Sequence, residues 1–171
     1  MTEYAYELKI PKARIAVLIG KNGSNKKRIE KETKTELKID SKEGDVFISG
    51  ADALGLFSAR EVIKAIGRGF NPDIANLLLK GDYVFEQIDI TEFTGKDKNK
   101  MKRLKGRVIG EGGRSRKTIE ELTGSYISIY GKTICIIGEP EGAPNARRAV
   151  ESLLKGSPHG NVYKWLEKQR K

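Results

Sequence analysis

The sequence predicts an α+β protein in which one small β-α-α-β-β-α unit occurs twice and a further helix ends the chain. Three observations predict this fold. Residues 19–30 match residues 109–120 at an offset of 90, and each stretch contains a Gly-x-x-Gly loop. Gly50 and Gly138 each close an apolar run, at an offset of 88. Around each loop, short alternating runs typical of strands flank segments with helical spacing, so each copy has the elements of a small domain.

The first half of the first copy contains a strand and two short helices. Polar and apolar residues alternate over residues 7–10, which predicts a short strand that ends at Pro11. Residues 12–18 then form a short helix, because proline is well suited to a first helical turn. A glycine loop follows. We expect Ser24 to be the N-cap of the next helix, in which Ile29 faces the core.

The second half of the first copy contains two strands and a closing helix. Residues 36–40 alternate as a strand with Leu37 and Ile39 pointing inward. Residues 46–48 form the next strand after a turn, and residues 51–67 form the closing helix. We expect the apolar positions of that helix to face the core. They are Leu54, Phe57, Val62, Ile63 and Ile66.

The second copy repeats this order of elements. The expected elements are a strand at 83–90, a basic helix at 99–108, a glycine loop at 110–113, a helix at 115–122, strands at 126–130 and 133–137, and a helix at 145–155. We therefore expect a first domain at 1–70, a connecting helix at 71–81, a second domain at 82–157 and a C-terminal helix at 158–171.

Two segments, each of which includes residues outside the repeat, carry apolar residues that could dock within the chain or contact a partner. The stretch 71–93 is acidic and apolar, and the last helix carries Trp165. We favour docking within the chain for four aliphatic side chains of these segments, and a buried anchor for Trp165 over stacking on a base. The four are Leu77, Leu78, Val162 and Leu166.

The charge of the chain favours polyanions as partners. The 171 residues include 33 Lys and Arg against 23 Asp and Glu, which gives a formal net charge of +10. This charge is uneven: +4 over residues 1–70, −4 over residues 71–93 and +10 over residues 94–171. The positive excess therefore lies mainly in the second copy, where a nucleic acid would be attracted most strongly.

The sequence lacks the residue patterns of an enzyme or a metal protein. Cys135 is the only cysteine and His159 the only histidine, so an intrachain disulfide and a Cys/His zinc site are excluded. His159 lies in a Pro/Gly-rich loop, where a solvated imidazole is expected. No G-x-x-x-x-G-K-[ST] phosphate loop and no carboxylate cluster for a two-metal nuclease is present. We expect no catalysis, no cofactor and no metal.

The sequence also gives no sign of a membrane location. No apolar run approaches the roughly 18 residues that a membrane span needs. The first residues lack a signal-peptide pattern. We therefore expect a cytoplasmic protein without a membrane partner.

The two Gly-x-x-Gly loops, at 20–23 and 110–113, are the candidate binding sites. A glycine turn before a helix exposes backbone N–H groups to an anion, and the missing side chains let a sugar–phosphate backbone approach closely. One such loop alone would be interpreted as a plain helix–helix turn. Its recurrence in the same frame, each time before a basic helix, favours the functional interpretation.

With these two loops in their repeated frame, the chain resembles proteins with two type I KH domains in tandem. The motifs that carry the resemblance are Val17-Leu18-Ile19-Gly20-Lys21-Asn22-Gly23 and Gly106-Arg107-Val108-Ile109-Gly110-Glu111-Gly112-Gly113. The resemblance implies a three-stranded sheet packed on helices, and loops that clamp about four nucleotides of single-stranded RNA or DNA. It also implies an aliphatic groove for the bases. Its walls would be Ala16, Leu18, Leu37 and Ile39 in the first copy, and Gly106, Val108, Ile127 and Ile129 in the second, with plain core packing as the alternative.

Seven cations in a short run precede the second loop, and such a run is either a solvated helix face or a track for a phosphate backbone. We favour the track. Glu111 departs from the usual basic residue of the loop and would repel a phosphate, but surrounding arginines keep the local balance positive. The residues that we expect to bind RNA are Gly20, Lys21, Asn22, Gly23, Lys26, Lys27, Lys102, Arg103, Gly106, Arg107, Gly110, Glu111, Gly112, Gly113, Arg114, Arg116 and Lys117.

The connector at 67–78 and the tail at 156–163 narrow the resemblance to the archaeal small-subunit assembly factors of the pre-rRNA-processing family. Members of that family partner the endonuclease that makes the final cut at the 3′ end of small-subunit rRNA. The resemblance implies binding of single-stranded rRNA near that end. It also implies contacts with the endonuclease and with other assembly or translation factors. Two alternatives remain open: a KH-based protein–protein adaptor, and a general RNA-binding regulator that is not dedicated to rRNA.

Overall fold

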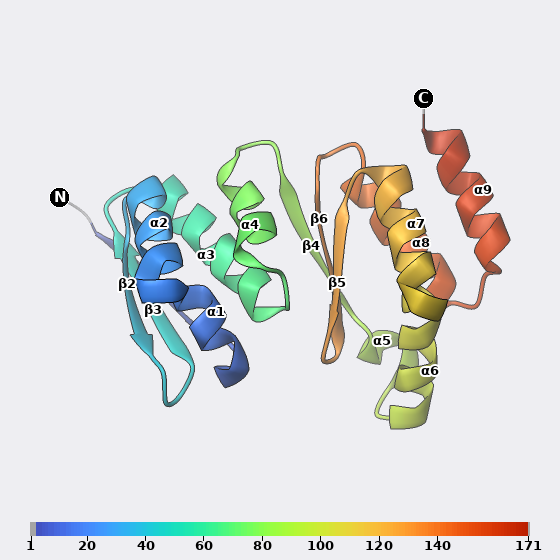
Figure 1. Cartoon of the computed structure of the whole chain (residues 1–171), viewed down its shortest axis with the longest axis horizontal. Coiled ribbons are helices and arrows are strands. Elements are labelled where there is room, and N and C mark those ends of the chain that lie inside the picture. The colour runs from blue at the N-terminus through green and yellow to red at the C-terminus, as the bar shows by residue number, and fades with distance from the viewer. Residues whose placement is uncertain (1–2, 171) are drawn as a thin grey trace. The chain divides into compact units, whose positions relative to one another are not determined.

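The computed structural model describes residues 3–170, and the chain divides between Gly81 and Asp82 into two compact units (Figure 1). Each unit has one three-stranded antiparallel sheet with helices packed on it. The predicted α+β class and the repeated order of elements are confirmed. Within the described residues no helix is long and apolar enough to cross a membrane.

The first unit contains one sheet of strand order β1-β3-β2. In β3, Val46 and Ile48 are fully buried whereas Phe47 between them is 42% exposed, so the helices cover one face of the sheet. Its elements are β1 (Tyr4–Lys9), η1 (Lys12–Arg14), α1 (Ile15–Ile19), η2 (Lys21–Gly23), α2 (Ser24–Thr33), β2 (Glu36–Asp40), β3 (Asp45–Gly50), α3 (Ala53–Gly67), α4 (Pro72–Ala75) and η3 (Asn76–Leu79).

The core face of α3 differs from the predicted one. Val62, Ile63 and Ile66 are fully buried as expected, but Leu54 is 79% exposed and Phe57 is 50% exposed. The positions that complete the buried stripe are instead the neighbours Leu56 and Ala59. The reason is angular, since a helix turns about 100° per residue and the two exposed residues fall on the side opposite to the stripe.

The start of α2 also differs from the prediction. Gly23, with φ +75°, is the N-cap, and no side chain caps this end of the helix. Ser24 already has helical angles (φ −60°, ψ −42°) and is the first residue of the helix, so its prediction as the N-cap was wrong. A glycine in the left-handed region turns the chain directly into the helix and leaves no half-turn for a serine cap.

The connector at 71–81 belongs to the first unit. Asn71 caps α4 by accepting from Ile74 N at 3.0 Å. Asn76, in η3, donates its side-chain amide to Asn25 Oδ1 at 3.1 Å, and Leu78 is buried. Docking within the chain, which we favoured for Leu78, is therefore confirmed. The four predicted segment boundaries stay a prediction, and their outermost residues (1–2 and 171) lie outside the described residues.

The second unit repeats the plan with two additional helices. Its sheet has the order β4-β6-β5. Val162 and Leu166 of the last helix are buried, which confirms their docking, and the half-buried Trp165 lies under the Arg148 guanidinium at 4.8 Å. The elements are β4 (Val84–Asp89), α5 (Thr91–Thr94), α6 (Lys98–Ile109), η4 (Glu111–Gly113), α7 (Arg114–Thr123), β5 (Tyr126–Tyr130), β6 (Thr133–Gly138), α8 (Ala143–Leu154) and α9 (His159–Gln169).

The path from the first strand to the glycine loop is longer in the second unit. Gly20 follows the strand end at Lys9 by 11 residues, whereas Gly110 follows the equivalent Asp89 by 21 residues. The added length forms α5, which the sequence did not predict, and the first turns of α6. Asp97 caps α6 by accepting from Lys100 N at 3.0 Å.

Candidate nucleic-acid interface

The two glycine loops have nearly the same backbone. Gly20 has φ 76° and ψ 172°, and Gly110 has φ 75° and ψ 168°. The third loop residue is left-handed in both, at φ 55° for Asn22 and φ 63° for Gly112. Asparagine is one of the few side chains that tolerate this region, which explains why it can replace glycine there. The repeat predicted from the sequence therefore extends to the loop conformation.

The first glycine of each loop is required by the fold. A Cβ on Gly20 would lie 2.8 Å from Asn25 N, and one on Gly110 would lie 2.6 Å from Ser115 N. In contrast, a Cβ on Gly112 would have no heavy atom within 4 Å. The first glycine thus permits the loop to fold back on the next helix, while the outer part of the loop is open for a ligand.

Each loop leads into a ten-residue helix whose N-terminal N–H groups no side chain caps. The N-cap residues are Gly23 for α2 and Gly113 for α7, and neither provides a side-chain acceptor. Exposed N–H groups and the positive end of the helix dipole favour an anion at this position. The predicted loop residues Lys21, Asn22, Glu111 and Gly112 are all exposed around it.

An open hollow of about 450 Å³ lies beside the second loop. Six of the predicted RNA-binding residues line it: Arg103, Gly106, Arg107, Gly110, Glu111 and Arg114. Three further lining residues were missed by the sequence reasoning: Ser115, His159 and Tyr163. Residues of α6, the loop, α7 and α9 thus meet at one place, although α9 lies outside the repeat.

Ser115 differs from its counterpart in the first copy. It is 2% exposed, and its Oγ has no hydrogen-bond partner among residues 3–170. The equivalent Asn25 donates to Leu18 O at 2.9 Å and accepts from Asn76. An unpaired buried hydroxyl costs free energy unless a ligand or water satisfies it. The alignment with Asn25 was the sequence signal that could have identified this position.

Arg107 has a structural role that the sequence did not indicate. Its Nε donates to Leu153 O at 3.0 Å, and an Nη atom donates to Ser157 O, so the guanidinium holds the end of α8. Arg116 donates an Nη atom to Ile127 O at 3.4 Å. Hydrogen bonds to the protein backbone therefore engage these two of the four arginines that we expect to bind RNA.

His159 is not the solvated imidazole that the sequence suggested. It is half-buried at the start of α9, and its Nε2 donates to Arg107 O at 2.8 Å. That carbonyl belongs to the last turn of α6, where helix carbonyls lack partners within the helix. Its ring lies 6.1 Å from that of Tyr163, between ring centres. The histidine thus joins α9 to the helix that precedes the loop.

The basic run forms an exposed face of α6. Leu104 and Val108 are buried, whereas Lys102 and Arg103 are exposed. No lysine of this helix takes part in any ion pair identified within the described chain. Of the remaining predicted cations, Lys27, Arg114 and Lys117 are exposed and Lys26 is half-buried. These positions are free to meet a phosphate backbone.

The predicted aliphatic groove is largely core. Four of its expected walls are at most 2% exposed, so they cannot contact a base in this conformation: Leu18, Leu37, Val108 and Ile127. Ile39 and Ile129 are half-buried, and Ala16 and Gly106 are exposed. For these four residues the structure agrees with the alternative of plain core packing, because the inward face of β2 and β5 and the buried sides of α1 and α6 pack within each unit. In residues 3–170 no group of three or more His, Cys, Asp or Glu side chains could hold a metal ion.

Comparisons with known proteins agree with this geometry. A model of the eukaryotic type KH domain (KH domain type I) matches residues 84–171, and a KH-domain model matches residues 5–65. A KH domain-containing protein of Methanocaldococcus jannaschii is 51% identical over 167 residues, which are 95% of this chain and 73% of that protein.

Two further relatives are a fungal protein and a chain in a solved complex. The pre-rRNA-processing protein PNO1 of Candida albicans is 36% identical over 116 residues, or 66% of this chain; the chain spans only 41% of that protein. A chain in the crystal structure of an a/eIF2alpha–aDim2p–rRNA complex from Pyrococcus horikoshii is 45% identical, with a TM-score of 0.91 over 98% of this chain and 94% of that one. The chain therefore belongs to the family of KH-domain proteins whose members include the pre-rRNA-processing protein PNO1.

Proposed function

We propose that this chain is a cytoplasmic RNA-binding protein of small-subunit ribosome assembly, which binds single-stranded rRNA near its 3′ end and assists the processing endonuclease. The observation that carries this proposal is the hollow beside the second glycine loop. There the uncapped start of α7, the unpaired Ser115 hydroxyl and the exposed guanidinium groups of Arg103 and Arg114 converge.

The hollow can hold a phosphate backbone by combining three kinds of contact. The N–H groups at the start of α7 face the anion, and Arg103 and Arg114 supply charge. Ser115 lines the hollow, and a local movement that uncovers its buried, unpaired hydroxyl would let it donate to a phosphate oxygen or pair with a ribose 2′-OH. Gly106 has no side chain, and a Cβ there would have no heavy atom within 4 Å, so sugar or base can approach α6 closely.

The remaining predicted residues have supporting roles in this proposal. Lys102 and Lys117 flank the hollow along α6 and α7 as exposed cations, and Gly112 and Gly113 keep the outer loop open. Glu111 lines the hollow and selects against a second phosphate on its side. In the first copy, the loop Gly20–Gly23 with Lys26 and Lys27 is a weaker site, because its unit carries less net charge.

The dedication to rRNA is supported by the relatives. One carries the name of a pre-rRNA-processing protein, and another was solved in a complex that contains rRNA. The proposed partners are the rRNA 3′-end endonuclease and other assembly or translation factors. The chain itself is proposed to make no cut, and it should leave rRNA intact in a nuclease assay with Mg²⁺.

Crosslinking in living cells followed by sequencing of the bound RNA tests this proposal. We expect enrichment of the 3′ region of small-subunit rRNA or its precursor. A matched sample carrying Glu111→Asp with Gly112→Asp should lose most of that enrichment. Enrichment of unrelated transcripts would refute the role in ribosome assembly and favour a general RNA-binding regulator. Absence of any crosslinked RNA would refute RNA binding and favour a protein adaptor.

A further inference from the structure

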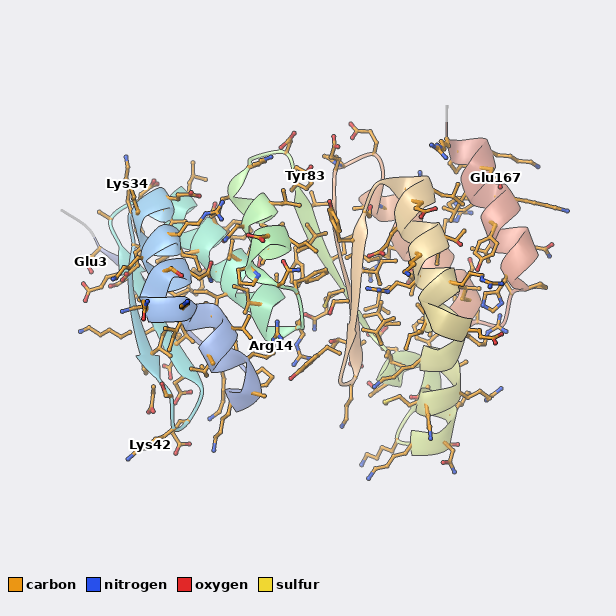
Figure 2. All side chains as sticks on the ribbon, in the orientation of Figure 1. Glu3, Arg14, Lys34, Lys42, Tyr83 and Glu167 are labelled. Atoms are coloured by element: carbon orange, nitrogen blue, oxygen red, sulfur yellow. The ribbon has the colours of Figure 1, made fainter. Side chains whose placement is uncertain are left out.

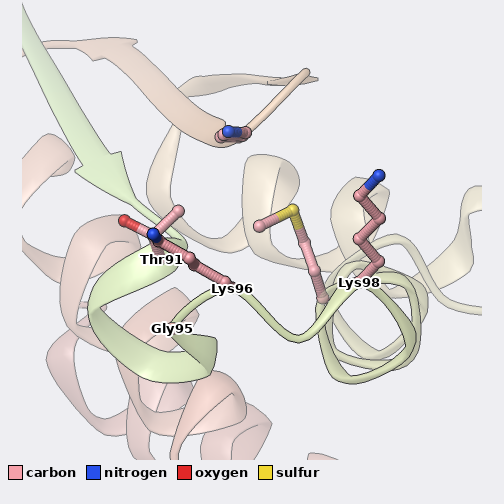
Figure 3. A pocket seen from close by; sticks show the side chains of 6 residues that line it. Thr91, Gly95, Lys96 and Lys98 are labelled. Atoms are coloured by element: carbon pink, nitrogen blue, oxygen red, sulfur yellow. The ribbon is translucent and has the colours of Figure 1, made fainter.

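A second open hollow, of about 540 Å³, lies in the second unit at the start of α6 (Figure 3). It is lined by Thr91, Gly95, Lys96, Lys98, Met101 and Lys132. The glycine loop lies at the opposite end of the same helix, which at 12 residues is about 18 Å long. The two hollows are therefore separate sites on one unit.

This hollow exists because of the longer path between strand and loop in the second copy. The added residues form α5, the turn into α6 and the first turn of α6, which together supply five of the six lining residues. The sixth, Lys132, comes from the turn between β5 and β6, and Ile90 N donates to its carbonyl at 2.9 Å. That bond fixes the turn against the start of α5. The first copy, which is ten residues shorter here, has no α5.

The lining combines a small apolar floor with a cationic rim. Met101 is half-buried and lines the hollow together with Thr91, Gly95, Lys96 and Lys98, which are labelled in Figure 3. Lys96, Lys98 and Lys132 are exposed, and no ion pair identified among residues 3–170 involves them. A polarisable sulfur favours contact with an aromatic ring, and lysines favour phosphates.

The acidic neighbours of the rim are already engaged. Asp89 Oδ1 accepts from Thr91 Oγ1 at 2.6 Å and from Thr91 N at 2.9 Å. These hydrogen bonds, with a smaller contribution from Lys132, lower the pKa of Asp89. Asp97 Oδ1 accepts from Lys100 N as the cap of α6. Both carboxylates thus organise the backbone around the hollow, and neither forms an ion pair with the rim lysines.

We propose that this hollow is a nucleotide subsite, which takes a base over Met101 and the adjoining phosphates on Lys96, Lys98 and Lys132. The proposal rests on the proposed RNA binding and extends it to a nucleotide outside the stretch that the glycine loop holds. Exposed cations of α6 lie between this hollow and the glycine loop. A nucleic-acid strand carries one phosphate per nucleotide and could contact these cations in succession, which favours RNA over an acidic peptide.

The test compares RNA lengths on one variant. Lys96→Ala, Lys98→Ala and Lys132→Ala are combined, and affinities are measured by fluorescence anisotropy for a tetranucleotide and for a 12-nucleotide strand from the rRNA 3′ end. We expect about a tenfold weaker binding of the long strand, with the tetranucleotide unaffected. The slope of log K against log salt for the long strand should become shallower by about 2, since each phosphate contact contributes about 0.7.

A matched control removes the same charge elsewhere on the unit. Lys164→Ala, Lys168→Ala and Arg170→Ala are exposed changes on and just after α9. An equal loss in this control would show that net charge alone acts, and it would overturn the subsite. An equal loss for both RNA lengths, or no loss for either, would overturn it too. Adenosine monophosphate serves as a third probe: binding to the wild type that the triple variant loses would support a site for a base with its phosphate. If the triple variant loses this binding but binds the 12-nucleotide strand as tightly as the wild type, a free nucleotide is the ligand and the strand contact is refuted.

The apolar floor is tested separately. Met101→Ala should weaken binding of the 12-nucleotide strand without changing the salt slope, and Met101→Leu should restore most of it. A thermal melt of each variant shows whether the half-buried site still folds. If the wild type binds neither RNA length, the proposed function itself fails, which is distinct from failure of the subsite alone.

Discussion

The two copies share their loop and differ in what surrounds it. Gly20 and Gly110 agree within a few degrees in both backbone angles, yet the first loop is followed by a satisfied Asn25 and the second by an unpaired Ser115. The second copy also has a ten-residue longer approach to the loop and an additional helix, α9. The duplicated motif therefore gives both copies the same loop backbone, and the elements that differ give each loop different surroundings.

The two units also differ in the arginine that hydrogen-bonds to the end of the closing helix. In the first unit Arg14, labelled in Figure 2, donates to Ile66 O and Phe70 O at 2.7 Å each. In the second unit Arg107 donates to the carbonyls of Leu153 and Ser157, which are the equivalent positions at an offset of 87. Arg107 aligns one helical turn beyond Arg14. The same helix end is thus held by an arginine from a different turn, so the contact is preserved although the sequence position is not.

Charge substitutions in the two loops should affect RNA binding to different degrees. Glu111→Asp with Gly112→Asp should weaken single-stranded RNA binding by about tenfold or more, since two carboxylates then face the phosphate site. Lys21→Asp with Asn22→Asp should cost only a few-fold, although it changes the charge more. Anisotropy with one rRNA oligonucleotide measures both. Equal losses, or none, would contradict the ranking of the two copies.

The second residues of α2 and α7, Asn25 and Ser115, allow a separate test of stability and RNA affinity. Ser115→Ala removes an unpaired buried hydroxyl and should change the free energy of unfolding by less than about 1 kcal/mol, while RNA affinity falls a few-fold. Asn25→Ala breaks two buried hydrogen bonds and should cost about 2 kcal/mol of stability. Chemical denaturation and anisotropy separate the two effects. A strongly destabilising Ser115→Ala would show that the hydroxyl is already satisfied within the protein.

The sequence predicts those features that local chemistry alone determines. The left-handed φ angles at Gly20, Gly110 and Gly113 demand glycine, so the repeated glycine spacing is enough to identify both loops. Strand alternation located β2 and β5 to the residue. These features depend on a few neighbouring residues, which is why they can be read directly from one sequence.

The features that sequence reasoning missed depend on contacts between distant segments. Arg107, which appeared to be a loop cation, is committed to carbonyls that lie 46 and 50 residues further along the chain. His159 reaches back 52 residues to α6. The exposed Leu54 and Phe57 are a different kind of miss, because the 100° spacing of helix positions already places them opposite to Val62, Ile63 and Ile66.

The edge strands β1 and β4 make different side-chain contacts, and we expect this difference to have the smallest effect on the stability of the two units. In the first unit the Arg60 guanidinium lies 5.0 Å above the ring of Tyr6, and in the second unit the equivalent Arg147 pairs with Glu86 at 3.2 Å. The first edge is consequently aromatic and the second is polar. The first unit also exposes further large apolar side chains, each at least 44% exposed: the aromatic Tyr4, Tyr6 and Phe57 and the aliphatic Leu54. Large exposed apolar patches mark interaction sites, so the first unit is where we expect the endonuclease to bind.

Exchanging the two edges tests this last contrast. Tyr6→Glu gives the first edge the ion pair of the second, and its stability should change by less than about 1 kcal/mol because the partners are exposed. RNA affinity should stay the same, since the loops are untouched, while binding of the rRNA 3′-end endonuclease should weaken several-fold in calorimetry. Glu86→Tyr is the matched change in the second unit and should leave endonuclease binding unchanged. The aromatic edge of the first unit supplies the apolar area that a partner could bury, so the first change should have the larger effect. Weakening by the second change and not by the first would contradict this and place the protein contact on the polar edge.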